Sequence, residues 1–262
     1  MVNMMKTQVY LIGAGPGDPD LITLKAVKAL QKANVVLIDD LVNRDILQHA
    51  PNARIVEVGK RGGCKSTPQH FINRMMIALA QQGECVVRLK GGDPFMFGRG
   101  GEEMLALREA GIEPEIISGI TSGIAAAASI GIPVTHRGYT HGVTFVTGHT
   151  QDDECPDWKA LAATGTTLVI YMGMKHLSQI TTELLAAGLN ADMPVAAIQN
   201  GTSETQKQVV TTLAMLPLAV QQEGLASPAI IVVGDVVRLA KSIHTEYALP
   251  GDSVVNTVAV AA

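Results

Sequence analysis

Short apolar runs rich in β-branched residues alternate with stretches of helical periodicity along the first half of the chain. These runs predict strands at 9–12, 35–38, 54–58, 85–89 and 115–117. Apolar residues recur at helical spacing between them, in the sets Leu21, Leu24, Val27, Leu30 and Phe71, Met75, Leu79, and an alanine-rich helix is expected over 121–130. Strands that alternate with helices imply a parallel sheet with right-handed crossovers.

A second set of segments follows the break at Gly131-Ile132-Pro133. Strands are expected at 143–147, 166–172, 195–199, 206–211 and 229–233, and helices at 158–163, 176–187, 213–222 and 236–241. Two of these strands are separated by Asn200-Gly201-Thr202-Ser203, which is typical of a hairpin turn. The expected fold is therefore α/β with two α/β domains. A mainly parallel sheet occupies 1–132, a mixed sheet occupies 133–245, and a loosely ordered tail covers 246–262.

Composition narrows the function classes. The 262-residue chain is 47% hydrophobic, has a formal net charge of −4 and contains only 3% aromatic residues, which argues against a nucleic-acid partner. Its three cysteines, Cys64, Cys85 and Cys155, are far apart and odd in number, and suggest neither a disulfide framework nor a zinc site. Since no signal segment and no membrane-length apolar run is evident, we expect a soluble cytoplasmic protein without a membrane partner.

The run from Gly91 to Glu102 is the most informative segment. The pair Gly91-Gly92 directly follows a predicted buried strand, where the absence of Cβ atoms lets another molecule touch the main chain. Asp93 precedes Pro94 and is therefore biased to an extended backbone. Arg99 and Glu102 are three residues apart and should share a face as a helix begins. An ordinary strand-to-helix turn does not need this much permissive backbone, so the segment is a candidate binding loop.

A second glycine-rich loop, Gly13-Ala14-Gly15-Pro16-Gly17-Asp18-Pro19, stands where a dinucleotide-binding fingerprint would be expected. It departs from that fingerprint because Asp18 takes the place of the third glycine and Pro16 removes an amide donor. An acidic residue at a helix N-terminus also repels phosphate, although Asp18 or Asp20 could simply cap the helix. The loop suits a ligand without phosphate and disfavours a nicotinamide oxidoreductase.

Together these segments resemble the tetrapyrrole methylases. The matching segments are 13–19, Asp39-Asp40-Leu41-Val42, Gly59-Lys60-Arg61, 91–100, Gly119-Ile120-Thr121-Ser122 and Tyr171-Met172-Gly173, and the resemblance extends from Val9 to about Lys241. It implies two α/β domains with an active-site cleft between them, S-adenosylmethionine held in that cleft, and a homodimer. It implies no metal, because the sulfonium methyl group of the donor is already electrophilic.

The resemblance also implies which residues contact the methyl donor. They are Pro16, Gly91, Gly92, Asp93, Met96, Thr121, Ser122, Met172 and Gly201. The residues themselves leave alternatives open, since Thr121 and Ser122 could serve only as a helix cap and Met172 could belong to the core. Asp93 and the two hydroxyl groups are suited to hydrogen-bond a ribose or an amino-acid group.

Within this family the segments are most similar to those of enzymes that methylate uroporphyrinogen III at two ring carbons (C2 and C7), giving precorrin-2 via precorrin-1 for sirohaem, cobalamin or haem d1 synthesis. A substrate with eight carboxylates needs fixed cations, and Lys60, Arg61, Arg99 and Arg137 all lie in predicted loops or at element ends. The resemblance implies that Arg99, Glu102 and Arg137 contact the substrate.

Two further residues have chemical roles implied by the resemblance. Asp39, at the end of the second predicted strand, would accept a proton, and Lys60, after the third, would donate one. Asp39 could instead be a turn residue beside Asp40, and Lys60 could solely bind a carboxylate. The alternatives for the whole chain are a family member acting on a later precorrin, diphthine synthase, a ribosomal RNA methyltransferase, or a ligand-binding protein without catalysis.

Overall fold

The computed structural model describes residues 8–59, 67–148 and 156–240. The chain divides into two compact units, each formed by two stretches of sequence. The first unit contains Met1–Ser129 and Asn200–Gln206, and the second contains Ile130–Gln199 and Lys207–Ala262. The expected tail at 246–262 lies outside the described residues.

The first unit is built on a five-stranded sheet with the order β3-β2-β4-β1-β5. Its strands are β1 (Val9–Gly13), β2 (Val35–Ile38), β3 (Arg54–Glu57), β4 (Val86–Lys90) and β5 (Glu115–Ile117). Every pairing between them is parallel, which confirms the expected architecture. Because parallel strands end at the same edge, the loops that follow β1, β2, β4 and β5 emerge together.

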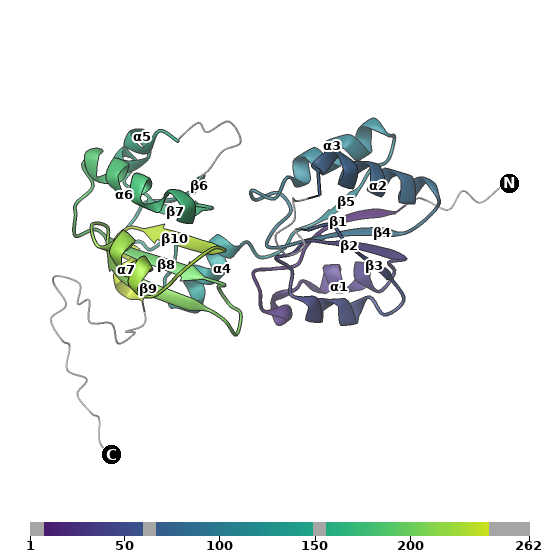
Figure 1. Ribbon diagram of the computed structural model, residues 1–262, viewed down its shortest axis with the longest axis horizontal. Coiled ribbons are helices and arrows are strands. Elements are labelled where there is room, and N and C mark those ends of the chain that lie inside the picture. Colours follow the sequence, from purple (N-terminus) through teal and green to yellow (C-terminus); the bar gives the residue numbers. More distant parts are fainter. Residues whose placement is uncertain (1–7, 60–66, 149–155, 241–262) are drawn as a thin grey trace, which may run out of the picture. The chain divides into compact units, whose positions relative to one another are not determined.

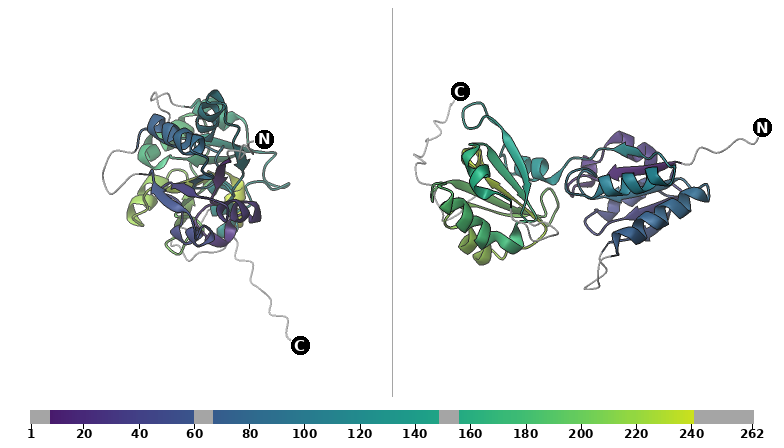
Figure 2. Two further views of the ribbon diagram at one scale, coloured as in Figure 1. Left: turned by 90° about the vertical axis from the view of Figure 1, so that its right-hand side faces the viewer. Right: turned by 90° about the horizontal axis from the view of Figure 1, so that it is seen from above.

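Helices cover both faces of this sheet (Figure 1). Helix α1 (Leu24–Leu30) packs on one face, in a core shared with Ile12, Val87 and Leu89. Helices α2 (Gln69–Gln81) and α3 (Gly100–Glu109) pack on the opposite face, in a second core. The right-hand view of Figure 2 looks down on this second face. Helix α4 (Ser122–Ser129) follows β5.

The helices of the first unit are where the sequence predicts them, but their buried faces differ. In α1 the buried residues are Ala26, Ala29 and Leu30, whereas Leu24 is 79% exposed. In α2 the buried residues are Ile72, Met76, Leu79 and Ala80, and Phe71 is half-exposed. A spacing of three falls short of a 3.6-residue turn, so the set from Leu21 to Leu30 spreads around the helix.

The second unit contains a mixed sheet with the order β6-β7-β10-β8-β9. Its strands are β6 (Val143–Thr147), β7 (Thr167–Tyr171), β8 (Pro194–Gln199), β9 (Lys207–Thr212) and β10 (Ala229–Val233). Only β6 and β7 pair in parallel, and β8 and β9 form the expected antiparallel hairpin. The prediction of a parallel first sheet and a mixed second sheet is confirmed.

One large core holds the second unit together. Helices α5 (Trp158–Ala163), α6 (Leu177–Ala186) and α7 (Leu216–Gln222) pack against strand residues such as Ile170, Val195 and Ile231. The helix expected at 236–241 is a 3₁₀ helix at Asp235–Leu239. Within the described part of the chain, no helix has the length and apolar character needed to cross a membrane.

Candidate active site

Three loops of the first unit meet at glycine residues. Gly13 ends β1, Gly92 follows β4, and Gly119 follows β5. A Cβ atom on Gly13 would lie 2.5 Å from both the Gly92 oxygen and the Gly119 nitrogen, and one on Gly119 would lie 2.3 Å from the Gly92 oxygen. Since such distances are far inside van der Waals contact, any side chain at Gly13 or Gly119 would force the three loops apart.

Main-chain hydrogen bonds fix two of these loops to each other. Gly15 N–H donates to the Gly92 carbonyl at 3.2 Å, and Gly92 N–H donates to the Gly15 carbonyl at 2.7 Å. These amides are therefore committed within the protein, and neighbouring Pro16 has no N–H. The loop after β1 consequently lacks the array of free amides that holds a pyrophosphate in dinucleotide-binding proteins.

The Asp93 carboxylate joins the third loop to this assembly. Its Oδ1 accepts a hydrogen bond from Phe95 N–H at 2.8 Å, and its Oδ2 accepts one from Gly119 N–H at 3.1 Å. Each carboxylate oxygen can accept a further hydrogen bond. Asp93 thus fixes the loop geometry and still offers acceptor positions to a ligand with hydroxyl or amino groups.

The turn between β8 and β9 also belongs to this unit. Asp18 N–H donates to Thr202 Oγ1 at 3.1 Å, and Asn43 Nδ2 donates to the Gly17 carbonyl at 2.9 Å. A Cβ atom on Gly17 would lie 3.1 Å from the carbonyl oxygen of Gly201, so the two loops are in close contact. The structure therefore brings Pro16 and Gly201, which are distant in sequence, into neighbouring loops.

Strained backbone marks the same segments. Among the residues that the structure describes, five non-glycine residues have positive φ angles, namely Phe97, Arg99, Met172, Asn200 and Thr202, with values from 48° to 70°. Such conformations cost free energy and cluster at functional sites. Met172 is also 49% exposed, so it is not the core residue that its apolar character allowed.

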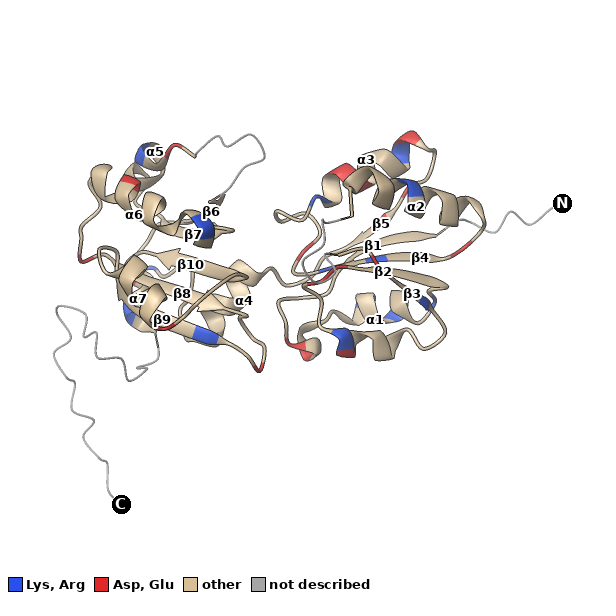
Figure 3. Ribbon diagram, viewed as in Figure 1, with Lys and Arg blue, Asp and Glu red and all other residues tan. Residues whose placement is uncertain are grey.

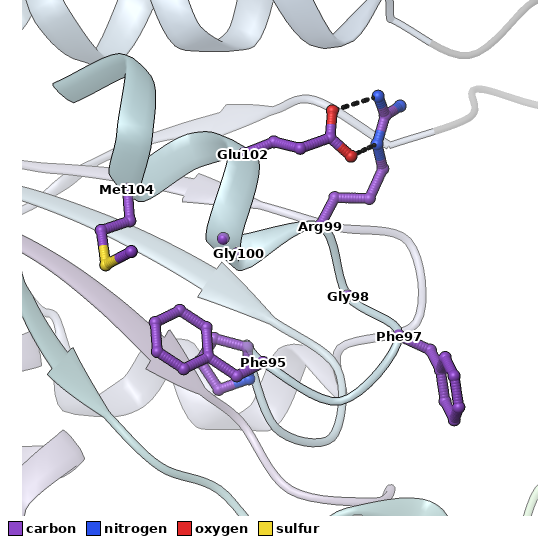
Figure 4. A pocket seen from close by; sticks show the side chains of 9 residues that line it. Phe95, Phe97, Gly98, Arg99, Gly100, Glu102 and Met104 are labelled. Atoms are coloured by element: carbon purple, nitrogen blue, oxygen red, sulfur yellow. Dashed lines mark hydrogen bonds and ion pairs between the residues drawn. The ribbon is translucent and has the colours of Figure 1, made fainter. Parts of the chain in front are cut away.

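Arg99 and Glu102 form an ion pair beside an open hollow of about 490 Å³ (Figure 4). Arg99 Nε and Nη2 donate to the two Glu102 oxygens at 2.8 and 2.6 Å, which confirms that the two side chains share a face. The hydrogen bonds from Arg99 lower the pKa of Glu102 and those to Glu102 raise the pKa of Arg99. Phe95, Phe97 and Met104 are the large apolar residues that line the hollow.

Asp39 lies just beyond β2 and reaches toward strand β4. Its Oδ1 accepts a hydrogen bond from Arg88 Nη2 at 2.5 Å, and its Oδ2 lies 3.7 Å from Lys90 Nζ. The Asp39 side chain remains 28% exposed, so one carboxylate of this cluster is open to solvent. Asp39 also begins a turn, because its carbonyl accepts a hydrogen bond from Val42 N–H at 3.3 Å, so a turn residue here also contacts a buried guanidinium.

The remaining predicted residues fall in three places. Gly91 and Met96 lie in the loop after β4, and Thr121 and Ser122 begin α4, where the Thr121 carbonyl accepts from Ile124 and Ala125 N–H. Arg137 is exposed in the second unit. Lys60 and Arg61 lie outside the described residues.

Sequence reasoning did not identify several residues that shape the site. They are Gly13, Gly119, Asn43, Thr202, Arg88, Lys90 and Glu103. The two glycines lie in or beside segments that the sequence did single out. Arg88 lies within the predicted apolar strand 85–89, and Lys90 follows it directly. Charged residues at such positions were a usable signal that they form buried ion pairs with Glu103. No group of three or more potential metal ligands occurs in the described ranges.

Comparison with known proteins identifies the family of this chain. Residues 8–217 match the family of Tetrapyrrole (Corrin/Porphyrin) Methylases, and the chain belongs to this family. The chain is 56% identical over 234 residues to the uroporphyrinogen-III C-methyltransferase of Pseudomonas aeruginosa, covering 89% of this chain and 96% of that protein. It is 48% identical over 237 residues to the siroheme synthase of Chromobacterium violaceum, covering 90% of this chain and 50% of that protein.

A solved structure is similar over the same length. The uroporphyrin-III C-methyltransferase of Thermus thermophilus, crystallised with S-adenosylhomocysteine, superposes with a TM-score of 0.75 at 38% sequence identity. The match covers 88% of this chain and 99% of that chain.

Proposed function

We propose that this protein transfers methyl groups from S-adenosylmethionine to C2 and C7 of uroporphyrinogen III, giving precorrin-1 and then precorrin-2. The observation that carries this proposal is the 56% identity to a uroporphyrinogen-III C-methyltransferase over nearly the whole of both chains. The siroheme synthase relative supports a place for the reaction in sirohaem biosynthesis. The same product would also serve cobalamin or haem d1 synthesis.

The glycine-rich loops of the first unit fit S-adenosylmethionine. When bound, this compound supplies an electrophilic methyl group on a sulfonium and requires no phosphate site. Gly91, Gly92 and Pro16 present main chain without bulky side chains, and Asp93, Thr121 and Ser122 present polar groups. We assign Met96, Met172 and Gly201 to the same donor site. Holding two reactants in line contributes roughly 7–11 kcal/mol to such a transfer.

Arg99, Glu102 and Arg137 are the proposed substrate contacts. A guanidinium binds a carboxylate through two parallel hydrogen bonds, and Arg99 already makes this contact with Glu102. An acetate or propionate group of the substrate would compete for the same donors. The exposed position of the pair, beside an open hollow lined by Phe95 and Met104, is suited to a large ring with charged edges.

Asp39 is the proposed proton acceptor. Attack by a ring carbon on the methyl group forms a carbon–carbon bond and leaves the macrocycle cationic. A C–H bond of the macrocycle then breaks, its electron pair neutralises the cation, and the proton passes to the Asp39 carboxylate. Acid–base help of this kind contributes about 10²- to 10⁴-fold. Lys60 is the proposed proton donor, by the family resemblance alone.

We further propose that the enzyme acts as a cytoplasmic homodimer, as the family resemblance implies. Its small negative net charge of −4 supports a small-molecule substrate rather than a nucleic acid. Sedimentation equilibrium would measure the oligomeric state directly.

Anaerobic incubation with uroporphyrinogen III and S-adenosylmethionine, followed by mass spectrometry, tests the proposed reaction. A gain of two methyl groups and two equivalents of S-adenosylhomocysteine is expected. If the donor binds and no methyl group is transferred, the substrate assignment is wrong. Later precorrins would then be the next acceptors to assay.

A further inference from the structure

Strand β4 carries charge in the interior of the first unit. Its residues Val86, Arg88 and Lys90 alternate onto the face that α2 and α3 cover, and Figure 3 shows basic residues on this strand within the sheet. Arg88 is 2% and Lys90 is 4% exposed, and Glu103 of α3 is fully buried. The cost of removing buried charges from water largely offsets their mutual attraction, even when they are paired. Stability alone therefore does not explain why this cluster is present.

Glu103 binds both cations. Its Oε1 accepts hydrogen bonds from Arg88 Nε at 2.9 Å, from Lys90 Nζ at 3.2 Å and from Gln69 Nε2 at 3.0 Å. Its Oε2 lies 3.2 Å from Lys90 Nζ without hydrogen-bond geometry. Three elements of the unit, α2, α3 and β4, thus converge on one carboxylate that cannot move without breaking these contacts.

The other end of the Arg88 guanidinium points to Asp39. Nη2 donates to Asp39 Oδ1, and Nη1 donates to the carbonyls of Leu37 and Leu89 at 3.3 and 3.4 Å. The planar guanidinium is therefore fixed on one side by Glu103 and on the other by main chain. Of the two carboxylates that Arg88 contacts, Asp39 is the one with solvent access, because its side chain is 28% exposed while that of Glu103 is buried.

We propose that Arg88, braced by Glu103, is a positioning residue that holds the Asp39 carboxylate in the orientation in which it accepts the proton. This inference rests on the proposed role of Asp39. It assigns the buried cluster to the reaction, with Glu103 and Arg88 acting only through Asp39. Arg88 forms no bond to the substrate and transfers no proton.

Lys90 cannot take over this task. Burial and the charge of Arg88 lower the pKa of Lys90, whereas a guanidinium stays protonated at any working pH. Lys90 Nζ is a point donor that hydrogen-bonds Glu103 and lies 3.7 Å from Asp39, whereas the planar fork of Arg88 hydrogen-bonds both carboxylates from one rigid group. The geometry therefore depends on arginine at this position.

The variant Arg88→Lys tests the proposal. It keeps the positive charge but lacks the fork, so we expect kcat to fall on the order of 10²-fold, the cost of a misplacement of about 1 Å. The KM values for both substrates and the affinity for S-adenosylhomocysteine should stay within about threefold of wild type. Arg108→Lys is the matched control, because Arg108 pairs with Glu113 on the exposed surface at the far end of α3 and should retain full activity.

A double-variant cycle separates positioning from general damage. Asp39→Asn alone should reduce kcat by about 10²- to 10⁴-fold. In that background Arg88→Lys should cause no further loss, because the group that Arg88 orients is already gone. Glu103→Gln preserves the shape of the side chain but weakens its interaction with Arg88, so it should lower kcat without changing KM. This variant provides the test if Arg88→Lys does not fold.

Three results would overturn the inference. Wild-type kcat in both Arg88→Lys and Glu103→Gln would show that Asp39 needs no such support. Losses that multiply in the double variant would show that Arg88 acts independently of Asp39. Full activity of Asp39→Asn would instead refute the proposed proton acceptor, and with it the inference. A wild-type enzyme that does not methylate uroporphyrinogen III would separately refute the proposed substrate.

Discussion

The hydroxyl oxygen of Thr202 accepts a hydrogen bond from the main-chain N–H of Asp18 at 3.1 Å, although 184 positions separate the two residues. This bond joins the glycine-rich loop after β1 to the turn between β8 and β9. Both loops carry residues that we assign to the donor site, Pro16 in the first and Gly201 in the second. This hydrogen bond, together with the close approach of Gly17 to Gly201, holds the two loops next to each other.

Thr202→Val should weaken donor binding. The substitution keeps the branched shape but leaves the Asp18 amide without its partner, which costs about 1–3 kcal/mol if the amide stays buried. We expect a several-fold higher Kd for S-adenosylhomocysteine, measured by isothermal titration calorimetry. Thr202→Ser retains the hydroxyl and is the control. Equal Kd values for the two variants would contradict a role for this hydrogen bond.

Gly119→Ala should abolish donor binding and destabilise the first unit. Its added Cβ would meet the Gly92 oxygen at 2.3 Å, a main-chain atom that cannot rotate away. Overpacking of this kind costs about 1–3 kcal/mol or more. Thermal unfolding should show a clear decrease in Tm.

Gly101→Ala is the matched control for that experiment. A Cβ at Gly101 would meet no atom within 4 Å, and Gly101 lies in the first turn of α3 without a positive φ. Alanine favours helix over glycine by about 0.5–1 kcal/mol, so Tm should rise. A similar loss of Tm in both variants would contradict the assigned close approach of the three loops.

Arg99→Ala should separate substrate binding from donor binding. The Arg99 side chain hydrogen-bonds Glu102 and takes no part in the main-chain hydrogen bonds between Gly15 and Gly92. Removing a guanidinium that binds a substrate carboxylate should raise the KM for uroporphyrinogen III by about 10-fold or more. The Kd for S-adenosylhomocysteine should not change. Full activity of this variant would refute the substrate contact.

Cys85 should give the protein a measurable sensitivity to alkaline pH. Burial raises the pKa of its thiol, while the charge of Lys32 opposes this effect. In the unfolded chain the thiol ionises near pH 8.5. Since ionisation then occurs first in the unfolded state, the stabilisation is complete below that pH and is lost as pH rises toward the folded pKa.

Urea unfolding of wild type and Cys85→Ala at pH 7.0 to 9.5 measures this effect. The free energy of unfolding should fall more steeply with pH in wild type than in the variant. Comparing the two slopes cancels the contribution from Lys90. Tyr10, whose pKa is raised by burial and by Cys85, ionises above this pH range in both the folded and the unfolded state. Identical slopes would show that the thiol is not protected.

Periodicity and turn chemistry predict the elements of this fold because they are local signals. The strands at Val35–Ile38, Glu115–Ile117 and Ala229–Val233 begin and end where the sequence places them. The buried side of a helix depends on what packs against it, which is why Leu24 is exposed and Ala26 is buried. Residue spacing alone does not contain that information.

The candidate site shows the same division. Asp93, Arg99 and Glu102 were identifiable because they lie in one unusual segment, in which Asp93 binds the Gly119 amide and Arg99 pairs with Glu102. Thr202 and Glu103 were not identifiable, because each matters only through a partner that the fold brings near. Glu103 in particular stands beside Glu102 in sequence, yet it points into the core while its neighbour faces solvent.

The loop Asn200–Gln206 belongs to the first unit although the strands on either side of it belong to the second. During synthesis the first unit is therefore incomplete until Gln206 has left the ribosome. An amino-terminal fragment ending at Ser129 would contain the whole parallel sheet and its helices, but Asp18 would lack its Thr202 partner. A chimera that takes the whole first unit from a relative must therefore replace residues 200–206 as well as residues 1–129.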